Sequence, residues 1–181
     1  MLSAECGIMK KEFKPRSRVK DDEARGAPKN PAMTFRFASA ADCPRLAEWN
    51  HQLIRDEGHR NPMTVAQLEV RMRGWLKAEY RAVIFEENGG WLAYILYREE
   101  AKEIYLRQLF VRRDRRRTGI GRKAVEIIRE KIWPKDKRLT LEVLVANGPA
   151  LAFWRAMGYA DYSLMLEIMP KREKKKNTQR S

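Results

Sequence analysis

Residues that could bind phosphate are concentrated in one stretch of the sequence, residues 103–130. Gly119 and Gly121 lie between an apolar run of strand length that ends at Val111 and an amphipathic helical pattern that follows Gly121. A helix that begins at a glycine turn presents free backbone N–H groups and the positive end of its dipole, so it can bind an anion. Basic side chains add positive charge to the same place: Arg112, Arg113, Arg115, Arg116, Arg117, Arg122 and Lys123. The stretch is therefore predicted to hold phosphate groups.

Three phosphate-binding patterns can be compared with this stretch. A P-loop requires G-x-x-x-x-G-K-[ST], which does not occur in the sequence. The dinucleotide pattern G-x-G-x-x-A fits residues 119–124, but it needs its first glycine almost directly after the strand of a βαβ unit. Here an arginine loop separates Val111 from Gly119, and the preceding segments are typical of antiparallel hairpins. The third pattern, R-x-x-G-x-G, fits residues 116–121 without these conflicts.

Composition predicts one domain with a basic chain end on each side. The 181 residues are 44% hydrophobic and carry a net charge of +14, which favours an anionic ligand and permits weak nucleic-acid association. Residues 1–33 and 171–181 are predicted to be disordered and basic, and residues 34–170 to form the folded domain. With two Cys and two His, neither a disulfide framework nor a metal site is predicted. No apolar run approaches the roughly 20 residues of a membrane span, and the cytoplasm is the predicted compartment.

Hydrophobic periodicity and turn residues predict the order of the elements. A strand at Phe35 and Phe37 precedes a helix that Asp42 caps and Gly58 ends, and Thr64 with Gln67 forms a capping box for a second helix. The remaining predicted elements are a hairpin of strands at 81–86 and 91–97, the central strand ending at Val111, a helix after Gly121, a strand at 139–145, a helix after Asn147, and one or two strands within 159–169.

A second motif supports the third phosphate pattern. Asn147-x-x-Ala150-x-x-Phe153-Trp154-x-x-x-Gly158-Tyr159 is similar to the N-x-x-A-x-x-F-Y-x-x-x-G-F motif of the GNAT (Gcn5-related N-acetyltransferase) superfamily, whose pyrophosphate motif the R-x-x-G-x-G string also resembles. The resemblance covers about residues 34–169. It implies an α+β fold with a central, mostly antiparallel sheet of six or seven strands flanked by about four helices.

The resemblance also implies a reaction, in which a primary amine of a small molecule or a protein attacks the thioester of acetyl-CoA directly. Two splayed strands, here Tyr105–Val111 and Leu139–Val145, would flank the donor. A backbone N–H at Phe110 or Val111 would polarise the thioester carbonyl, and Asn147 would bind the pantetheine arm. The implied cofactor-binding residues are Phe110, Val111, Arg116, Arg117, Thr118, Gly119, Ile120, Gly121, Arg122 and Asn147.

The sequence departs from the family pattern at two places. Many members have Tyr as general acid where this chain has Trp154, and an indole N–H cannot deliver a proton near neutral pH. Trp154 is therefore either a catalytic residue or a packing residue. The central strand resembles that of polyamine acetyltransferases, but Arg107 and Gln108 replace their two acidic residues. Arg107 would repel a polycation and could instead bind a carboxylate or phosphate on the acceptor.

The general base is left open by the sequence. Asp56, Glu57 and His59 fall in the loop between the first two helices, which lines the acceptor side in this family, and Glu142 is a further candidate. Glu57, Val111 and Trp154 are the predicted catalytic residues, and Arg107, Gln108 and His59 the predicted substrate-binding residues. A homodimer is predicted as well. The competing hypothesis is a CoA-binding or RNA- or ribosome-associated module of low catalytic activity, although no aromatic residues accompany the tail charges to stack bases.

Overall fold

The computed structural model describes residues 32–170, so the predicted basic ends lie outside it apart from residues 32 and 33. Five strands and four α-helices are found in the described range. In chain order they are β1 (Thr34–Phe37), α1 (Cys43–Asp56), α2 (Val65–Lys77), β2 (Tyr80–Glu87), β3 (Gly90–Glu99), β4 (Glu103–Val111), α3 (Ile120–Lys131), β5 (Arg138–Leu141) and α4 (Gly148–Ala156). Two short 3₁₀ turns, Ala40–Asp42 and Arg113–Arg115, precede α1 and α3.

The strands form one sheet in the order β1-β2-β3-β4-β5. The pairs β1–β2, β2–β3 and β3–β4 are antiparallel, and the pair β4–β5 is parallel. The predicted α+β class with a mostly antiparallel sheet and about four helices is therefore confirmed. The described residues hold five strands, however, where six or seven were predicted.

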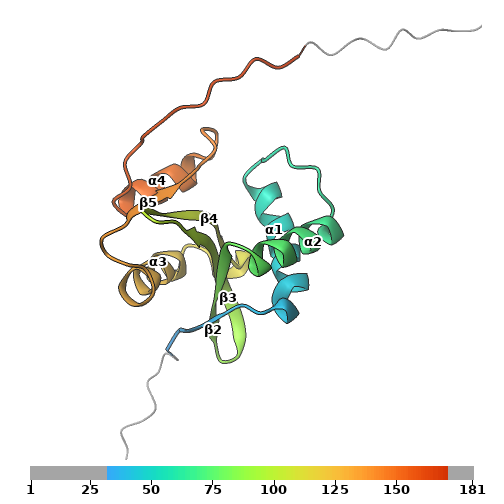
Figure 1. Ribbon diagram of the computed structural model, residues 1–181, viewed down its shortest axis with the longest axis vertical. Coiled ribbons are helices and arrows are strands. Elements are labelled where there is room, and N and C mark those ends of the chain that lie inside the picture. The colour runs from blue at the N-terminus through green and yellow to red at the C-terminus, as the bar shows by residue number, and fades with distance from the viewer. Residues whose placement is uncertain (1–31, 171–181) are drawn as a thin grey trace, which may run out of the picture. The chain divides into compact units, whose positions relative to one another are not determined.

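Two apolar cores lie on opposite faces of the sheet. Figure 1 shows α1 and α2 on one face and α3 and α4 on the other. Leu46, Trp49 and Met72 of the first helix pair pack against the side chains of β2, β3 and β4 that point to that face. Ala124, Val125 and Ile128 of α3, with Trp154 of α4, pack against the alternate side chains of the same strands. Alternation along each strand thus supplies both cores.

The turn and cap residues fold locally as their chemistry predicts. Thr64 and Gln67 form the capping box of α2, in which Gln67 Oε1 accepts from the Thr64 amide at 2.8 Å. Asn88 and Gly89 have φ values of 52° and 73°, and these positive angles suit the tight β2–β3 hairpin. The local signals therefore predicted the start of α2 and the position of the β2–β3 turn.

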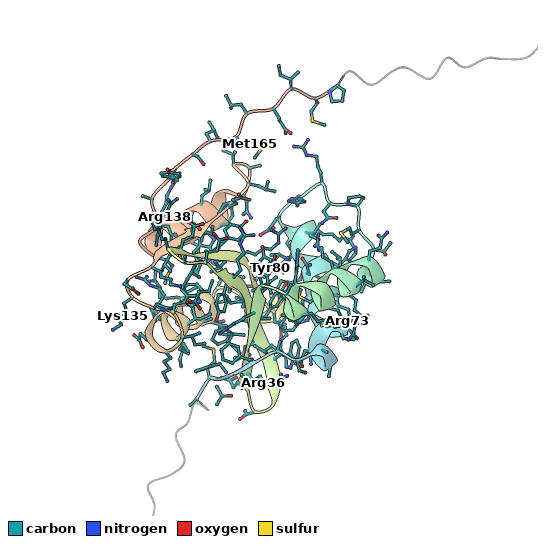
Figure 2. The ribbon with its side chains drawn as sticks, viewed as in Figure 1. Arg36, Arg73, Tyr80, Lys135, Arg138 and Met165 are labelled. Carbon is teal, nitrogen blue, oxygen red and sulfur yellow. The ribbon has the colours of Figure 1, made fainter. Side chains whose placement is uncertain are left out.

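The predictions for the last part of the chain were wrong. β5 ends at Leu141 and not at Val145, and residues 159–169 contain no strand. The segment Tyr162–Met169 is extended and exposes several large apolar side chains, with Ile168 100% exposed. Figure 2 shows Met165 on this segment, outside the helical layers that cover the sheet. Its alternating β-formers favour extended backbone, but a strand also needs a partner, and this segment pairs with no strand of the described residues.

Candidate active site

The N-terminus of α3 is open, as the sequence predicts. Its cap residue Gly119 has a φ of 85°, which is the left-handed region that glycine adopts without strain, and no side chain caps the helix. The Lys123 amide donates to the Gly119 carbonyl at 3.0 Å. The amides that precede Lys123 in the helix, those of Ile120, Gly121 and Arg122, have no partner within the helix geometry. The end of α3 therefore presents several N–H groups to an anion.

Gly121 packs the start of α3 against two neighbouring elements. A Cβ placed on this residue would lie 3.5 Å from Val111 Cγ2 and 3.6 Å from Phe153 Cε2. The beginning of α3, the end of β4 and one side of α4 are thus in contact. This contact brings the two sequence motifs, which are separated by about one helix and one strand, into the same site.

β4 and β5 separate beside this helix end. They pair from Glu103 with Arg138 as far as Leu106 with Leu141, and the rest of β4 has no β5 partner. On its other side β4 stays paired with β3, and the Arg112 amide donates to the Leu92 carbonyl at 2.9 Å. The space beside β4 beyond the end of its pairing with β5 is called the wedge below. Successive amides of an antiparallel strand point alternately towards and away from the partner strand. Since the Arg112 amide points to β3, the amide of Val111 faces the wedge and that of Phe110 faces β3.

The arginines of the loop differ in their partners. Arg113 and Arg116 both bind the carboxylate of Asp56, at 2.5 and 2.6 Å. Arg112 pairs with Asp114 and Arg115 with Glu87, each at 2.7 Å. Arg116 Nε also donates to the Val111 carbonyl at 3.0 Å. Four of the five loop arginines therefore hold the loop in place, a division that the sequence did not reveal.

Arg117, Thr118 and Arg122 lie directly before or within the first turn of α3. Arg117 has a positive φ of 64° and forms no ion pair within the described residues. Thr118 Oγ1 donates to the Arg115 carbonyl at 2.7 Å and so ties the loop to the helix start. Arg122 is 4.0 Å from Glu126, which is a weak contact between exposed groups. Arg117 and Arg122 are thus available to a ligand at the helix end.

The candidate bases at the end of α1 have opposite environments. Burial raises the pKa of Asp56, but hydrogen bonds from Arg113 and Arg116 outweigh it and leave this pKa below its ordinary value. Glu57, by contrast, is half-buried, and burial first and the neighbouring Asp56 charge next raise its pKa. A carboxylate with a raised pKa is the better proton acceptor near neutral pH. Glu57 therefore suits the role of base better than Asp56.

The three predicted substrate-binding residues do not lie in equivalent environments. Gln108 accepts from Tyr94 Oη at 3.0 Å and donates to Asn50 Oδ1 at 2.7 Å, so it belongs to a buried polar network. Arg107 is exposed, and its Cζ lies 4.6 Å from the ring centroid of Trp75. His59 is exposed in the α1–α2 loop, where its Nδ1 accepts from the Asn61 amide at 3.0 Å.

Trp154 and Asn147 both have structural contacts. Trp154 is 8% exposed and packs edge-on against Phe153 and Tyr159 in the core beneath α4, a position that suits the packing role. Asn147 Oδ1 accepts from the Ala150 amide at 3.2 Å and caps α4. The candidate Glu142 is exposed on the loop after β5 and accepts from Tyr105 Oη at 3.3 Å.

Two polar residues of this region were missed by the sequence analysis. Asn50 of α1 is fully buried, and its Nδ2 has no partner among the described residues. Arg71 of α2 is half-buried, and its Nε likewise has none. A signal for Arg71 was present, because it lies three residues after Leu68 and four before Trp75, on the apolar face of its own helix.

The other hollows and side-chain groups of the described residues are weaker candidates for a functional site. A hollow of about 660 Å³ lies between the end of α2 and the β3–β4 turn. No residue of the arginine loop or α3 lines it, and two of its charged side chains, Lys137 and Glu99, neutralise each other at 2.8 Å. Within residues 32–170 no three His, Cys, Asp or Glu side chains are grouped as metal ligands would be. None of the helices in this range has the length and apolarity needed to cross a membrane.

Comparison with known proteins identifies the family. Residues 42–159 match the profile of the Acetyltransferase (GNAT) family, whereas no curated protein is similar in sequence. Similar solved structures include aminoglycoside N-acetyltransferase AAC(6')-Iy in complex with CoA, with 12% identity, a TM-score of 0.64, and coverage of 81% of this chain and 99% of that one. A possible acetyltransferase from Clostridium difficile 630 has 18% identity, a TM-score of 0.60, and coverage of 77% and 99%. An aminoglycoside acetyltransferase from an uncultured soil metagenomic sample, in complex with sisomicin, has 13% identity, a TM-score of 0.58, and coverage of 78% and 97%. At these identities the structures show the fold alone, but the profile covers most of the chain. The chain belongs to the acetyltransferase (GNAT) family.

Proposed function

We propose that this protein transfers an acetyl group from acetyl-CoA to a primary amine, without a covalent enzyme intermediate. The observation that carries the proposal is the open N-terminus of α3 beside the wedge between β4 and β5. Free amides at a helix N-terminus fit a diphosphate, and an unpaired strand edge fits an extended, amide-containing chain. Coenzyme A contains both of these groups. One of the structural relatives was solved with CoA, which supports the same ligand.

The residues of this chain would divide the work of binding. The amides of Ile120, Gly121 and Arg122 would donate to the diphosphate, and Arg117 with Arg122 would add charge. Gly119 leaves room for close approach, because apart from adjacent residues and the backbone of its own helix no protein atom lies within 4 Å of a Cβ placed there. Thr118 and Arg116 would support the loop, and Asn147 would retain its place at the end of the wedge as a contact for the pantetheine arm.

The chemistry would depend on positioning and on two polar groups. Acetyl-CoA supplies an activated acyl group and a thiolate leaving group when it is bound. The outward-facing Val111 amide would donate to the carbonyl oxygen that gains negative charge, and this kind of contact contributes a large part of the rate in acyl transfer. Glu57 would accept the proton from the amine, directly or through water, because burial raises its pKa. We assign Trp154 to packing, so the thiolate would leave without help from this residue.

Two measurements test the proposal. Calorimetric titration should show that acetyl-CoA binds at micromolar concentrations, and a free-thiol assay with a panel of primary amines should show turnover. Absence of acetyl-CoA binding would refute the proposal. Retention of RNA that is lost at high salt, in a protein that turns over no amine, would favour the module hypothesis instead.

A further inference from the structure

Two arginine side chains from different elements meet at Trp75 of α2. Arg71 lies one helical turn before Trp75, and its Cζ is 4.5 Å from the centroid of the indole ring. Arg107 of β4 approaches the same ring to 4.6 Å and that of Tyr80, labelled in Figure 2, to 5.8 Å. Both guanidinium groups are within the range of cation–π attraction. Two like charges are therefore gathered over one aromatic side chain.

A β-bulge directs Arg107 to this place. Leu96 of β3 is opposite Gln108 and the next residue, Tyr97, is opposite Leu106, so Arg107 is the extra residue of β4. Arg107 and Gln108 consequently both make their contacts on the α1–α2 side of the sheet, with Trp75 and with Asn50 respectively. Bulges re-aim side chains in this way and are common beside functional sites.

Among residues 32–170 neither arginine has a carboxylate partner. Ion pairs in the described residues engage most of the loop arginines, but none of them involves Arg71 or Arg107. Arg71 Nε is buried with no acceptor in the part of the chain that the structure describes, and Asn50 Nδ2, in a residue with no exposed surface, is unpaired there too. Glu142 is engaged by Tyr105. Burial first, and the charge of Arg107 next, lowers the pKa of Arg71.

This arrangement costs free energy unless an anion is present. A buried donor without an acceptor destabilises the folded state, and more so when the group is charged. A carboxylate or phosphate between the two guanidinium groups would supply hydrogen-bond acceptors and cancel the repulsion between the two positive charges. Arginine binds these planar or tetrahedral oxyanions best, because its N–H groups match two of their oxygens at once. The aromatic wall of Trp75 and Tyr80 would exclude water from one side of such a contact.

The arginine pair lies within reach of the proposed acyl-transfer point. Arg107 is the first β4 residue beyond the pairing with β5, and Val111, whose amide faces the wedge, follows four residues later. At about 3.3 Å per residue, this separates the two backbone positions by roughly 13 Å. Because an arginine side chain spans several ångströms, one small molecule could contact Arg107 and extend an amine to the wedge.

From these observations we infer that the acceptor of this enzyme is an amine that carries an oxyanion, a carboxylate or a phosphate, which Arg71 and Arg107 bind over Trp75. The inference rests on the proposed function, because it names the substrate class of the same reaction. It also explains why a basic residue is present at position 107, where a polycationic acceptor would be repelled.

The test compares acceptors of equal length and different charge. Aminohexanoate, aminohexyl phosphate, hexylamine and diaminohexane are assayed with saturating acetyl-CoA. We expect kcat/KM for at least one anionic acceptor to exceed that for hexylamine by about 10- to 100-fold, because hydrogen bonds to charged groups are strong, and diaminohexane to be the poorest. The two anionic acceptors distinguish carboxylate from phosphate.

Three variants then locate the effect. In Arg71→Gln and Arg107→Gln the ratio of kcat/KM for the anionic acceptor to kcat/KM for hexylamine should fall towards one, and the KM for acetyl-CoA should not change. Arg45→Gln is the matched control, because Arg45 also lies over two indole rings, 5.4 Å from Trp49 and 4.7 Å from Trp91, and has no ion pair in the described residues. It should keep the preference.

Equal kcat/KM of the wild type for the anionic acceptors and for hexylamine would overturn the inference, as would a preference that survives in both arginine variants. If no amine is turned over, the proposed function fails, and calorimetric binding of acetamidohexanoate and acetamidohexyl phosphate still decides the inference. Binding of either one that is lost in Arg107→Gln but kept in Arg45→Gln supports the anion site, and absence of binding to the wild type refutes it.

Discussion

The variant Gly119→Ala tests the helix end on which the proposed function depends. Gly119 has a φ of 85°, and no atom lies within 4 Å of a Cβ placed on it. Alanine would therefore meet no steric obstacle in the protein, and its cost is the strain of an L-residue in the left-handed region, about 1–2 kcal/mol. For a domain of this size each kcal/mol lowers the melting temperature by about 2–4 °C, so we expect a decrease of roughly 2–8 °C.

The same methyl group should also weaken CoA binding. If the diphosphate approaches the Gly119 backbone closely, a Cβ occupies part of its space, and we expect the Kd for CoA to rise about tenfold or more. Differential scanning fluorimetry measures the first effect and isothermal calorimetry the second. Both are measured on the same preparation of each variant.

Gly89→Ala and Gly74→Ala are the matched controls. Gly89 has a φ of 73° in the β2–β3 turn and equal space around it, so its variant should lose similar stability with no change in CoA affinity. Gly74 lies inside α2 with space around it, so alanine should stabilise the protein by about 0.5–1 kcal/mol. CoA affinity that is unchanged in Gly119→Ala, or reduced equally in Gly89→Ala, would refute the assignment of the helix end as the diphosphate site.

Three further predictions concern charge. Hydrogen bonds from Arg36 lower the pKa of Asp42 from 3.8 to about 2, so Asp42→Asn should reduce the free energy of unfolding by about 1–2 kcal/mol at neutral pH. In urea unfolding, this difference between wild type and variant should be complete above pH 3.8 and lost as the pH falls through about 2. A difference that does not depend on pH would contradict this reasoning. Burial raises the pKa of Glu57 above 4.5, so the midpoint of the acidic limb in the pH profile of kcat/KM should lie above that value. Glu57→Gln should reduce the rate about 100-fold or more and remove this acidic limb. A variant that keeps the acidic limb would exclude Glu57 as the base. Arg117→Gln should weaken CoA binding about tenfold. Arg113→Gln should change it little, because the Arg113 side chain is paired with Asp56. If calorimetry shows the larger loss for Arg113→Gln, the distinction between ligand-binding and loop-holding arginines is wrong.

Local signals in the sequence were enough to predict the fold around the proposed phosphate site. The Gly119–Gly121 turn, the capping box at Thr64 and the Asn88-Gly89 hairpin each depend on the backbone needs of a few adjacent residues, and the structure has all three. The division of the arginines was not predictable in this way. Arg113 and Arg116 meet Asp56 only because the end of α1 is brought beside the loop by tertiary packing, across 57 and 60 residues of sequence.

Long-range pairing also explains what was missed in the proposed acceptor region. Arg107 was recognised as a departure from a family pattern, but nothing in the sequence placed it beside Trp75. The bulge that re-aims Arg107 depends on the register of β3 against β4, and a register is a property of two strands. The absent last strands have the same origin, because Tyr162–Met169 has the composition of a strand and lacks only a neighbour.

That uncovered C-terminal segment has a practical consequence for handling the protein. Leu164, Leu166 and Ile168 are between 65% and 100% exposed, and an extended apolar segment with unsatisfied backbone groups invites pairing between molecules. We expect the hydrodynamic radius measured by dynamic light scattering to increase with protein concentration, and the variant Leu166→Lys to suppress that increase. The solubility limit of this protein would then be set by the eight residues Tyr162–Met169, which lie outside its sheet and helices.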